Sequence, residues 1–218
     1  MSARPSKALF VGLLSCAVLL GASNAPFPDP AYDAPKPPTK GKETAVLAGG
    51  CFWGVEAVFD HLKGVSNVVS GFSGGEKNTA HYEEVSTGRT GHAESVKITY
   101  DPSQITYGEL LKVYFAVAHD PTELNYQGPD HGTQYRSAIF YANEEQRKIA
   151  TQYIQQLDKA GIFGHPIVTQ VVPLKGFYAA ESYHQHYLQN NPTDPYIMYN
   201  DIPKLVALKK QYPQMCRR

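Results

Sequence analysis

The sequence has few cysteines and no excess of charge of either sign, and both shortages limit what the protein can be. Only three of its 218 residues are cysteine, and none are spaced as C-x-x-C, so neither a disulfide-rich scaffold nor a zinc site is indicated. Lysine and arginine together number 20, as do aspartate and glutamate, and the body of the chain has no basic run. This balance argues against nucleic acid or an anionic membrane surface as a partner.

Long apolar runs are also scarce, and the one that is present lies at the N-terminus. A basic stretch, MSARPSK, precedes ALFVGLLSCAVLLGA, a run of about fifteen apolar residues that is short for a membrane span but typical of a secretory signal. We expect residues 1–25 to be a signal peptide, cleaved after Ser23 or Ala25, and the protein to be exported to a periplasmic or extracellular location. Because Leu13-Leu14-Ser15-Cys16 resembles a bacterial lipoprotein box, lipidation of Cys16 is the alternative.

Composition divides the rest of the chain into three parts. Residues 26–42 contain six prolines and almost no aliphatic side chains, which predicts an extended linker without a core of its own. Residues 43–200 carry the apolar periodicities of one folded domain, as expected for a chain of this length. Residues 201–218 are expected to be a C-terminal tail, which carries Cys216.

Within the domain, hydrophobic periodicity and turn residues predict an alternation of strands and helices. Strands are expected at 44–50, 65–75, 92–102, 136–141 and 166–174, and helices at 52–62, 106–119, 143–161 and 179–189. Thr106 with Glu109 and Asn143 with Gln146 have the spacing of helix N-terminal caps. The order β-α-β-β-α-β-α-β-α predicts a two-layer α/β sandwich with a mixed sheet and a split β-α-β, or ferredoxin-like, core.

Cys51 lies at the first of these strand-to-helix junctions, in GGCFWG. The N-terminus of a helix offers unpaired N–H groups and a partial positive charge, which favour a thiolate and therefore a nucleophile. The alternative is that Cys51 is a small buried hydrophobic residue. The flanking glycines allow close backbone approach, and Phe52 and Trp53 are suited to wall an apolar pocket beside the sulfur.

Several segments together resemble the signature segments of one known family. GGCFWGVEAVF, HYEEVSTGRTGHAESV, HDPT and GPDHGTQYRSAI, in this order and spacing, are similar to those of the A-type peptide methionine-S-sulfoxide reductases, and the resemblance runs from about residue 44 to about residue 199. It implies a two-layer α/β sandwich around a mixed sheet. The implied activity is thiol-dependent reduction of methionine-S-sulfoxide, free or in proteins, to methionine, which repairs proteins after oxidative stress.

The resemblance also implies the roles of the reacting groups. Cys51 would attack the sulfoxide sulfur and become a sulfenic acid. Glu94, in GHAE, matches the family's acidic residue, and a carboxyl group in a partly apolar site can stay protonated and supply the proton that the departing oxygen needs. Tyr82 and Tyr135 match two tyrosines whose hydroxyl groups would bind the sulfoxide oxygen.

Three more residues match the family's substrate site. Asp130, in GPDHGTQY, matches an aspartate that helps to organise the site. Phe52 and Trp53 would hold the terminal methyl group of the substrate.

The second half of the implied reaction requires another thiol. The sulfenic acid must condense to a disulfide, which an external dithiol such as thioredoxin reduces. Cys216 is the only other cysteine of the expected mature chain and is therefore the candidate resolving thiol, carried by a mobile tail. The Gly-rich, cysteine-bearing C-terminal segment of part of the family is missing, so direct reduction of the sulfenic acid by the external dithiol is the alternative. No metal or bound organic cofactor is implied, and a monomer is expected.

Two other functions are compatible with the same residues. A Cys-His acyl-transfer enzyme would use Cys51 with a neighbouring histidine, for which His81, His92, His119 and His131 are candidates. An exported binding module would instead join Cys51 and Cys216 in a structural bridge. A metal site at His184 and His186 is not favoured, since H-x-H on a helix would place the two rings on opposite faces.

Overall fold

The computed structural model of the chain describes residues 26–217, so the predicted signal peptide, with its cleavage sites and Cys16, lies outside the described residues. The strands are β1 (Glu43–Ala48), β2 (Val65–Ser73), β3 (Ala93–Tyr100), β4 (Tyr126–Gln127), β5 (Asp130–His131), β6 (Ala138–Tyr141), β7 (Gln170–Pro173) and β8 (Phe177–Ala179). The α-helices are α1 (Phe52–Asp60), α2 (Tyr82–Val85), α3 (Tyr107–Val113), α4 (Glu144–Lys159), α5 (Tyr187–Asn190) and α6 (Ile202–Gln211). No helix of this part of the chain has both the length and the apolar content that a membrane span needs.

A six-stranded mixed sheet forms the centre of the molecule, with the order β7-β6-β1-β3-β2-β8. Only β6 and β7 pair in parallel, and the other neighbours are antiparallel. The segment β1-α1-β2-β3-α3-β6 therefore has the spatial strand order β6-β1-β3-β2, which is the split β-α-β arrangement. The predicted two-layer α/β fold is confirmed.

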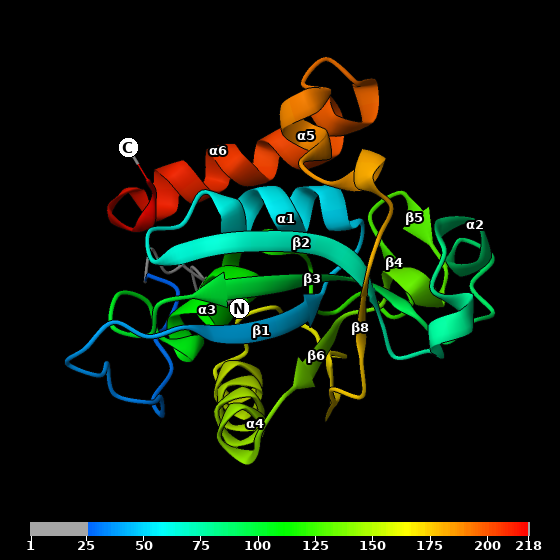
Figure 1. Cartoon of the computed structure of the whole chain (residues 1–218). Helices are drawn as coiled ribbons and strands as arrows, with labels where there is room; N and C mark the ends of the chain where they lie inside the picture. The colour runs from blue at the N-terminus through cyan, green and yellow to red at the C-terminus, as the bar shows by residue number, and fades with distance from the viewer. Residues whose placement is uncertain (1–25, 218) are drawn as a thin grey trace, which may run out of the picture.

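The two faces of the sheet bury different amounts of apolar surface. Side chains alternate along a strand, so Ala45 and Leu47 of β1 face the large cluster formed with α1, α3, α4 and α6, while Val46 and Ala48 face a smaller cluster on the other side. In the view of Figure 1, α1, α5 and α6 lie above the central strands and α4 lies below them, and side chains of α1, α4 and α6 all belong to the large cluster. The main core is thus the layer between the sheet and the helices.

The helix caps predicted from the sequence are present, whereas one predicted helix, at residues 179–189, does not form. Thr106 and Glu109 make both hydrogen bonds of a capping box before α3. Residues 179–189 do not form one helix, because a 3-10 turn at Ser182–His184 is separated from α5 by His186, whose φ is 53°. The buried carboxylate of Glu56 accepts the N–H of His186 at 3.0 Å, so a tertiary contact decides the backbone there.

Residues 26–42 contain no helix or strand, but they are not a free linker. The hydroxyl group of Tyr153, on α4, donates to the carbonyl of Pro28 at 2.6 Å, and Lys112, on α3, pairs with Asp29 at 2.6 Å. The carboxylate of Asp33 accepts from the N–H of Gly108 at the start of α3. These contacts fasten residues 27–36, which we call the N-terminal strap, across α3 and α4.

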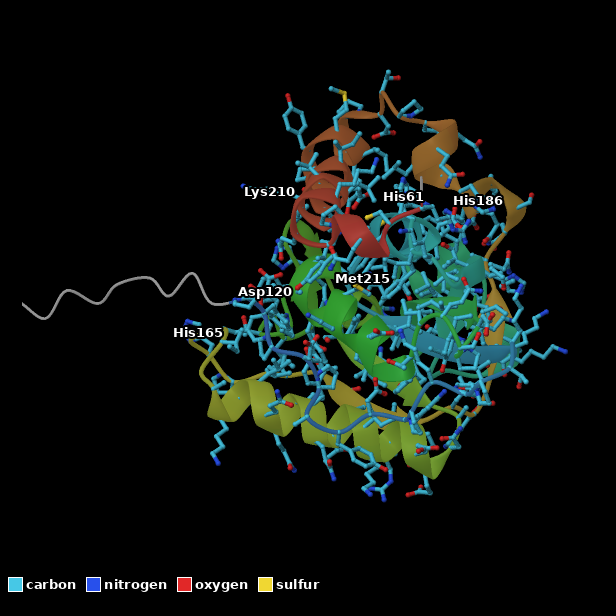
Figure 2. All side chains as sticks on the ribbon, turned by 90° about the vertical axis from the view of Figure 1, so that its left-hand side faces the viewer. His61, Asp120, His165, His186, Lys210 and Met215 are labelled. Atoms are coloured by element: carbon cyan, nitrogen blue, oxygen red, sulfur yellow. The ribbon has the colours of Figure 1, made fainter. Side chains whose placement is uncertain are left out.

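The C-terminal segment is also folded, which corrects the prediction of a mobile tail. It forms α6, then a 3-10 turn at Pro213–Met215. Cys216 makes a β-bridge with Leu62, and the N–H of Arg217 donates to the carbonyl of His61 at 2.8 Å. Figure 2 labels His61 and Met215 on this part of the molecule. The last described residues are thus bound beside the C-terminal end of α1.

Candidate active site

The glycines around Cys51 let the chain turn from β1 into α1 within three residues. Gly50 has a φ of 87°, in the left-handed region that favours glycine. A Cβ atom at this position would lie 2.5 Å from the side chain of Gln127, in the β4-β5 hairpin. The turn makes Cys51 the N-cap residue of α1, as predicted from the strand-to-helix junction.

Glu94 lies directly beside this helix terminus. It is on β3, its side chain is only 2% exposed, and its Oε2 atom accepts the N–H of Phe52 at 3.1 Å. Burial raises the pKa of Glu94 to about 8, against the opposing effect of the Phe52 N–H. At neutral pH the carboxyl group therefore carries a proton, which it can donate to a group that reacts with the neighbouring sulfur.

The protonation state of Cys51 differs from the sequence-based expectation. Burial raises the pKa of the Cys51 thiol well above its usual range, and negative charge on Glu94, once it is ionised, and on Asp201 raises it further, while the N–H of Trp53 and the charge of Lys204 lower it. The prediction of a favoured thiolate is thus wrong for the substrate-free protein. The helix terminus does supply a stabilising N–H, but removal of the sulfur from water outweighs it.

Aromatic rings form a wall around Phe52 and Trp53. Trp53 stacks on Tyr187 with ring centroids 3.8 Å apart, and Tyr196 meets it edge-on at 5.9 Å. The indole N–H of Trp53 donates to Nδ1 of His184, whose ring lies 5.1 Å from that of Phe52. Phe52 is buried and Trp53 half-buried, so the wall has a fixed inner part and an accessible rim.

The other predicted site residues gather at the same place. Tyr82 begins α2 and Tyr135 ends a 3-10 turn before β6. Burial, and then the charge that Glu94 carries when it is ionised, raises the pKa of both tyrosines, so both hydroxyl groups keep their protons. Asp130, on β5, accepts a hydrogen bond from the hydroxyl group of Tyr196.

Three residues at this site were not predicted from the sequence. Tyr196 is one of fifteen tyrosines and has no local signal that distinguishes it. In the sequence, His184 is distinguished only as half of an H-x-H motif, although in the structure its ring lies 5.1 Å from that of Phe52 and 4.3 Å from that of Tyr82. Asp201 stands in the segment that was expected to be a tail, so its effect on Cys51 could not be inferred.

The structure does not bring Cys216 to Cys51. Both thiols are free and buried, and they lie beyond opposite ends of α1, a nine-residue helix about 14 Å long. A disulfide needs Cα atoms about 4.4–6.8 Å apart, so a structural bridge is wrong for this conformation. The resolving role would require the C-terminal segment to leave Leu62.

The structure gives little support to a Cys-His acyl-transfer enzyme or to a metal site. Within residues 26–217, no hydrogen bond joins Cys51 to a histidine, and His119, buried against Ser137, has its pKa lowered by burial to about 3. No group of three or more His, Cys, Asp or Glu side chains in that range could hold a metal ion.

Comparisons with known proteins identify one family. The family model for peptide methionine sulfoxide reductase matches residues 43–215. The chain is 63% identical to peptide methionine sulfoxide reductase MsrA 2 of Mesorhizobium japonicum, over 80% of this chain and 90% of the relative. Reduced Mxr1 from Saccharomyces cerevisiae is 36% identical with a TM-score of 0.63, covering 73% of this chain and 91% of the other. Methionine sulfoxide reductase A of Corynebacterium diphtheriae is 41% identical with a TM-score of 0.61, covering 71% and 77%.

Proposed function

This chain belongs to the peptide methionine sulfoxide reductase family, and from that premise we propose that Cys51 and Glu94 are its reacting pair. The activity is the thiol-dependent reduction of methionine sulfoxide to methionine, an oxidoreductase reaction that repairs oxidised methionine. We assign it to the S epimer, as the sequence resemblance implies. The observation that carries the assignment of the pair is the buried, protonated carboxyl group of Glu94, bound to the N–H that follows Cys51.

In the first step the sulfur of Cys51 attacks the sulfoxide sulfur while Glu94 protonates the oxygen. The sulfur–oxygen bond of the substrate breaks, and the oxygen becomes the hydroxyl group of a Cys51 sulfenic acid. Cys51 loses two electrons and the substrate sulfur gains them. Because Cys51 enters as a thiol, its proton replaces the one that Glu94 donates, so the step needs no proton from solvent.

The surrounding groups bind the substrate during this step. The hydroxyl groups of Tyr82 and Tyr135 stay protonated because burial raises the pKa of both residues, so both can donate hydrogen bonds to the oxygen as its charge develops. Phe52 and Trp53 would hold the methyl group through apolar contact. Asp130 would act through Tyr196, which its carboxylate orients.

An external dithiol, thioredoxin or a thioredoxin-like protein, would then restore Cys51. Its first thiol attacks the sulfenic sulfur and releases water, and its second thiol attacks the mixed disulfide and releases Cys51 as a thiol. The position of Cys216 at the far end of α1 supports this direct route. Full turnover of a Cys216→Ser variant with the dithiol is expected, and its loss would show that Cys216 resolves the sulfenic acid after all.

The first experiment follows the two sulfoxide epimers separately. The purified mature chain is incubated with a dithiol and a mixture of S and R methionyl-sulfoxide peptides, and each epimer is measured by chromatography. Loss of the S epimer alone, abolished by Cys51→Ser, is the expected result. If neither epimer disappears while the protein is folded and Cys51 is reduced, the proposal fails, and acyl-ester probes that trap an acyl group on Cys51 would then support an acyl-transfer enzyme.

We propose, in addition, that residues 1–25 direct export to the periplasm or the outside of the cell. The support is the basic stretch followed by an apolar run. Mass spectrometry of the mature protein should find an N-terminus at Asn24 or Pro26, whereas a lipid on Cys16 would show that the protein is anchored. An intact Met1 in the cytoplasmic fraction would contradict export.

A further inference from the structure

Two charged side chains of the C-terminal segment lie against the first turn of α1. A Cβ atom added at Gly54 would lie 2.0 Å from Oδ1 of Asp201 and 2.9 Å from Nζ of Lys204. Gly54 is the third residue of the helix that follows Cys51. Because Gly54 has no side chain, the carboxylate of Asp201 and the ammonium group of Lys204 can occupy the space that a side chain at this position would fill.

Asp201 and Lys204 form an ion pair in this space. Nζ of Lys204 lies 3.1 Å from Oδ1 of Asp201, the carboxylate is fully buried, and the lysine side chain is only 18% exposed. The second carboxylate oxygen, Oδ2, has no hydrogen-bond partner among the described residues. Buried ion pairs add little net stability compared with apolar packing, so stability alone does not account for this pair.

The charges of the pair act on the reacting groups. The positive charge of Lys204 lowers the pKa of Cys51, where it opposes burial, the negative charge that Glu94, on β3, carries once it is ionised, and the negative charge of Asp201. It also lowers the pKa of Asp130, on β5. The ammonium group thus acts on both sides of the site, the helix that carries the nucleophile and the hairpin that carries Asp130.

We propose that Lys204 is a positioning residue of the oxygen-transfer step: held in place by Asp201, its ammonium group stabilises negative charge on the Cys51 sulfur during attack. The inference rests on the proposed function for the identity of that step. A buried thiol needs such a charge because the sulfur has no water to stabilise its anion. The tyrosines that also face Cys51, namely Tyr82, Tyr135 and Tyr196, keep their protons and supply no cation.

The test measures the acidity of Cys51 without substrate. The rate of alkylation of Cys51 by iodoacetamide is followed against pH by mass spectrometry of the peptide that contains it. Lys204→Met should raise the apparent pKa of Cys51 by about one unit, and Asp201→Asn should lower it by a similar amount. Lys210→Met, exposed on the same helix and labelled in Figure 2, is the matched control and should leave it unchanged.

Opposite signs distinguish a charge effect from structural damage, which would shift both variants in the same direction. In the peptide assay, Lys204→Met should lower kcat about tenfold for a one-unit change with little change in KM, and Lys204→Arg should restore most of the rate. Shifts of equal sign, or no shift with Lys204→Met, would overturn the inference. The two proposals can fail separately, because alkylation needs no sulfoxide. A wild-type protein that reduces neither epimer would refute the proposed function, whereas the alkylation shifts would still show whether Lys204 lowers the pKa of Cys51.

Discussion

Replacement of Glu94 by glutamine should change how the stability of the protein depends on pH. The pKa of Glu94 is about 8 in the folded protein, compared with an ordinary value of 4.5. Between pH 4.5 and pH 8, the Glu94 carboxyl group is therefore mostly protonated in the folded protein and mostly ionised in the unfolded chain. This contribution to stability is fully present below pH 4.5 and is lost as the pH rises to about 8.

The size of the effect follows from the two pKa values. Between pH 5 and pH 8 the linkage relation gives a loss of about 3.5 kcal/mol in the free energy of unfolding from this one group. The side chain is 2% exposed, so solvent screening does not reduce the figure. Glutamine has no proton to lose and keeps an oxygen that can accept the N–H of Phe52, so the Glu94→Gln variant should lack this loss.

Urea unfolding at pH 5, 6, 7 and 8 measures the difference directly. Wild type should lose about 3.5 kcal/mol more than Glu94→Gln across this range. Glu84→Gln, an exposed carboxylate on α2, is the matched control and should follow wild type. If wild type and Glu94→Gln changed in parallel, Glu94 would not be held as a buried acid, and its role as the proton donor would lose its physical basis.

Three further substitutions test the surroundings of the site. Gly54→Ala would place a Cβ atom 2.0 Å from the Asp201 carboxylate, so unfolding in urea should show a loss of about 1–3 kcal/mol; wild-type stability would contradict this packing. Asp33→Ala removes a hydrogen bond to the start of α3 and should cost about 1 kcal/mol in thermal unfolding while kcat/KM stays unchanged. Tyr187→Leu removes the ring stacked 3.8 Å from Trp53 and should raise KM severalfold; a fall in kcat alone would argue against a binding role.

The features that could be predicted from the sequence are those whose cause is local. The capping box of Thr106 with Glu109 and the cap of α4, where Asn143 accepts the N–H of Gln146, involve residues three positions apart. The junction that places Cys51 before α1 is signalled by glycines next to it in the chain. Both partners of each interaction lie within one turn of backbone, so the local sequence is enough to predict it.

The features that could not be predicted depend on partners far away in the chain. The left-handed residue His186 is stabilised by Glu56, which lies 130 positions earlier. Likewise, the pKa of Cys51 depends on how deeply the fold buries the sulfur and on Asp201, in the last helical segment. The dipole of α1 is a local effect that the sequence indicates, whereas the larger cost of removing the sulfur from water depends on the whole fold.

The N-terminal strap has a consequence for the order of folding during synthesis. Its hydrogen-bond partners on α4 follow it by as many as 127 positions, and those on α3 by about 75 positions. A growing chain cannot complete these contacts until α4 has emerged, and contacts of such long sequence separation form late. Residues 27–36 therefore stay without these partners while most of the protein is made, and if residues 1–25 direct export as proposed, this part of the chain would still be extended when it meets a translocation pore.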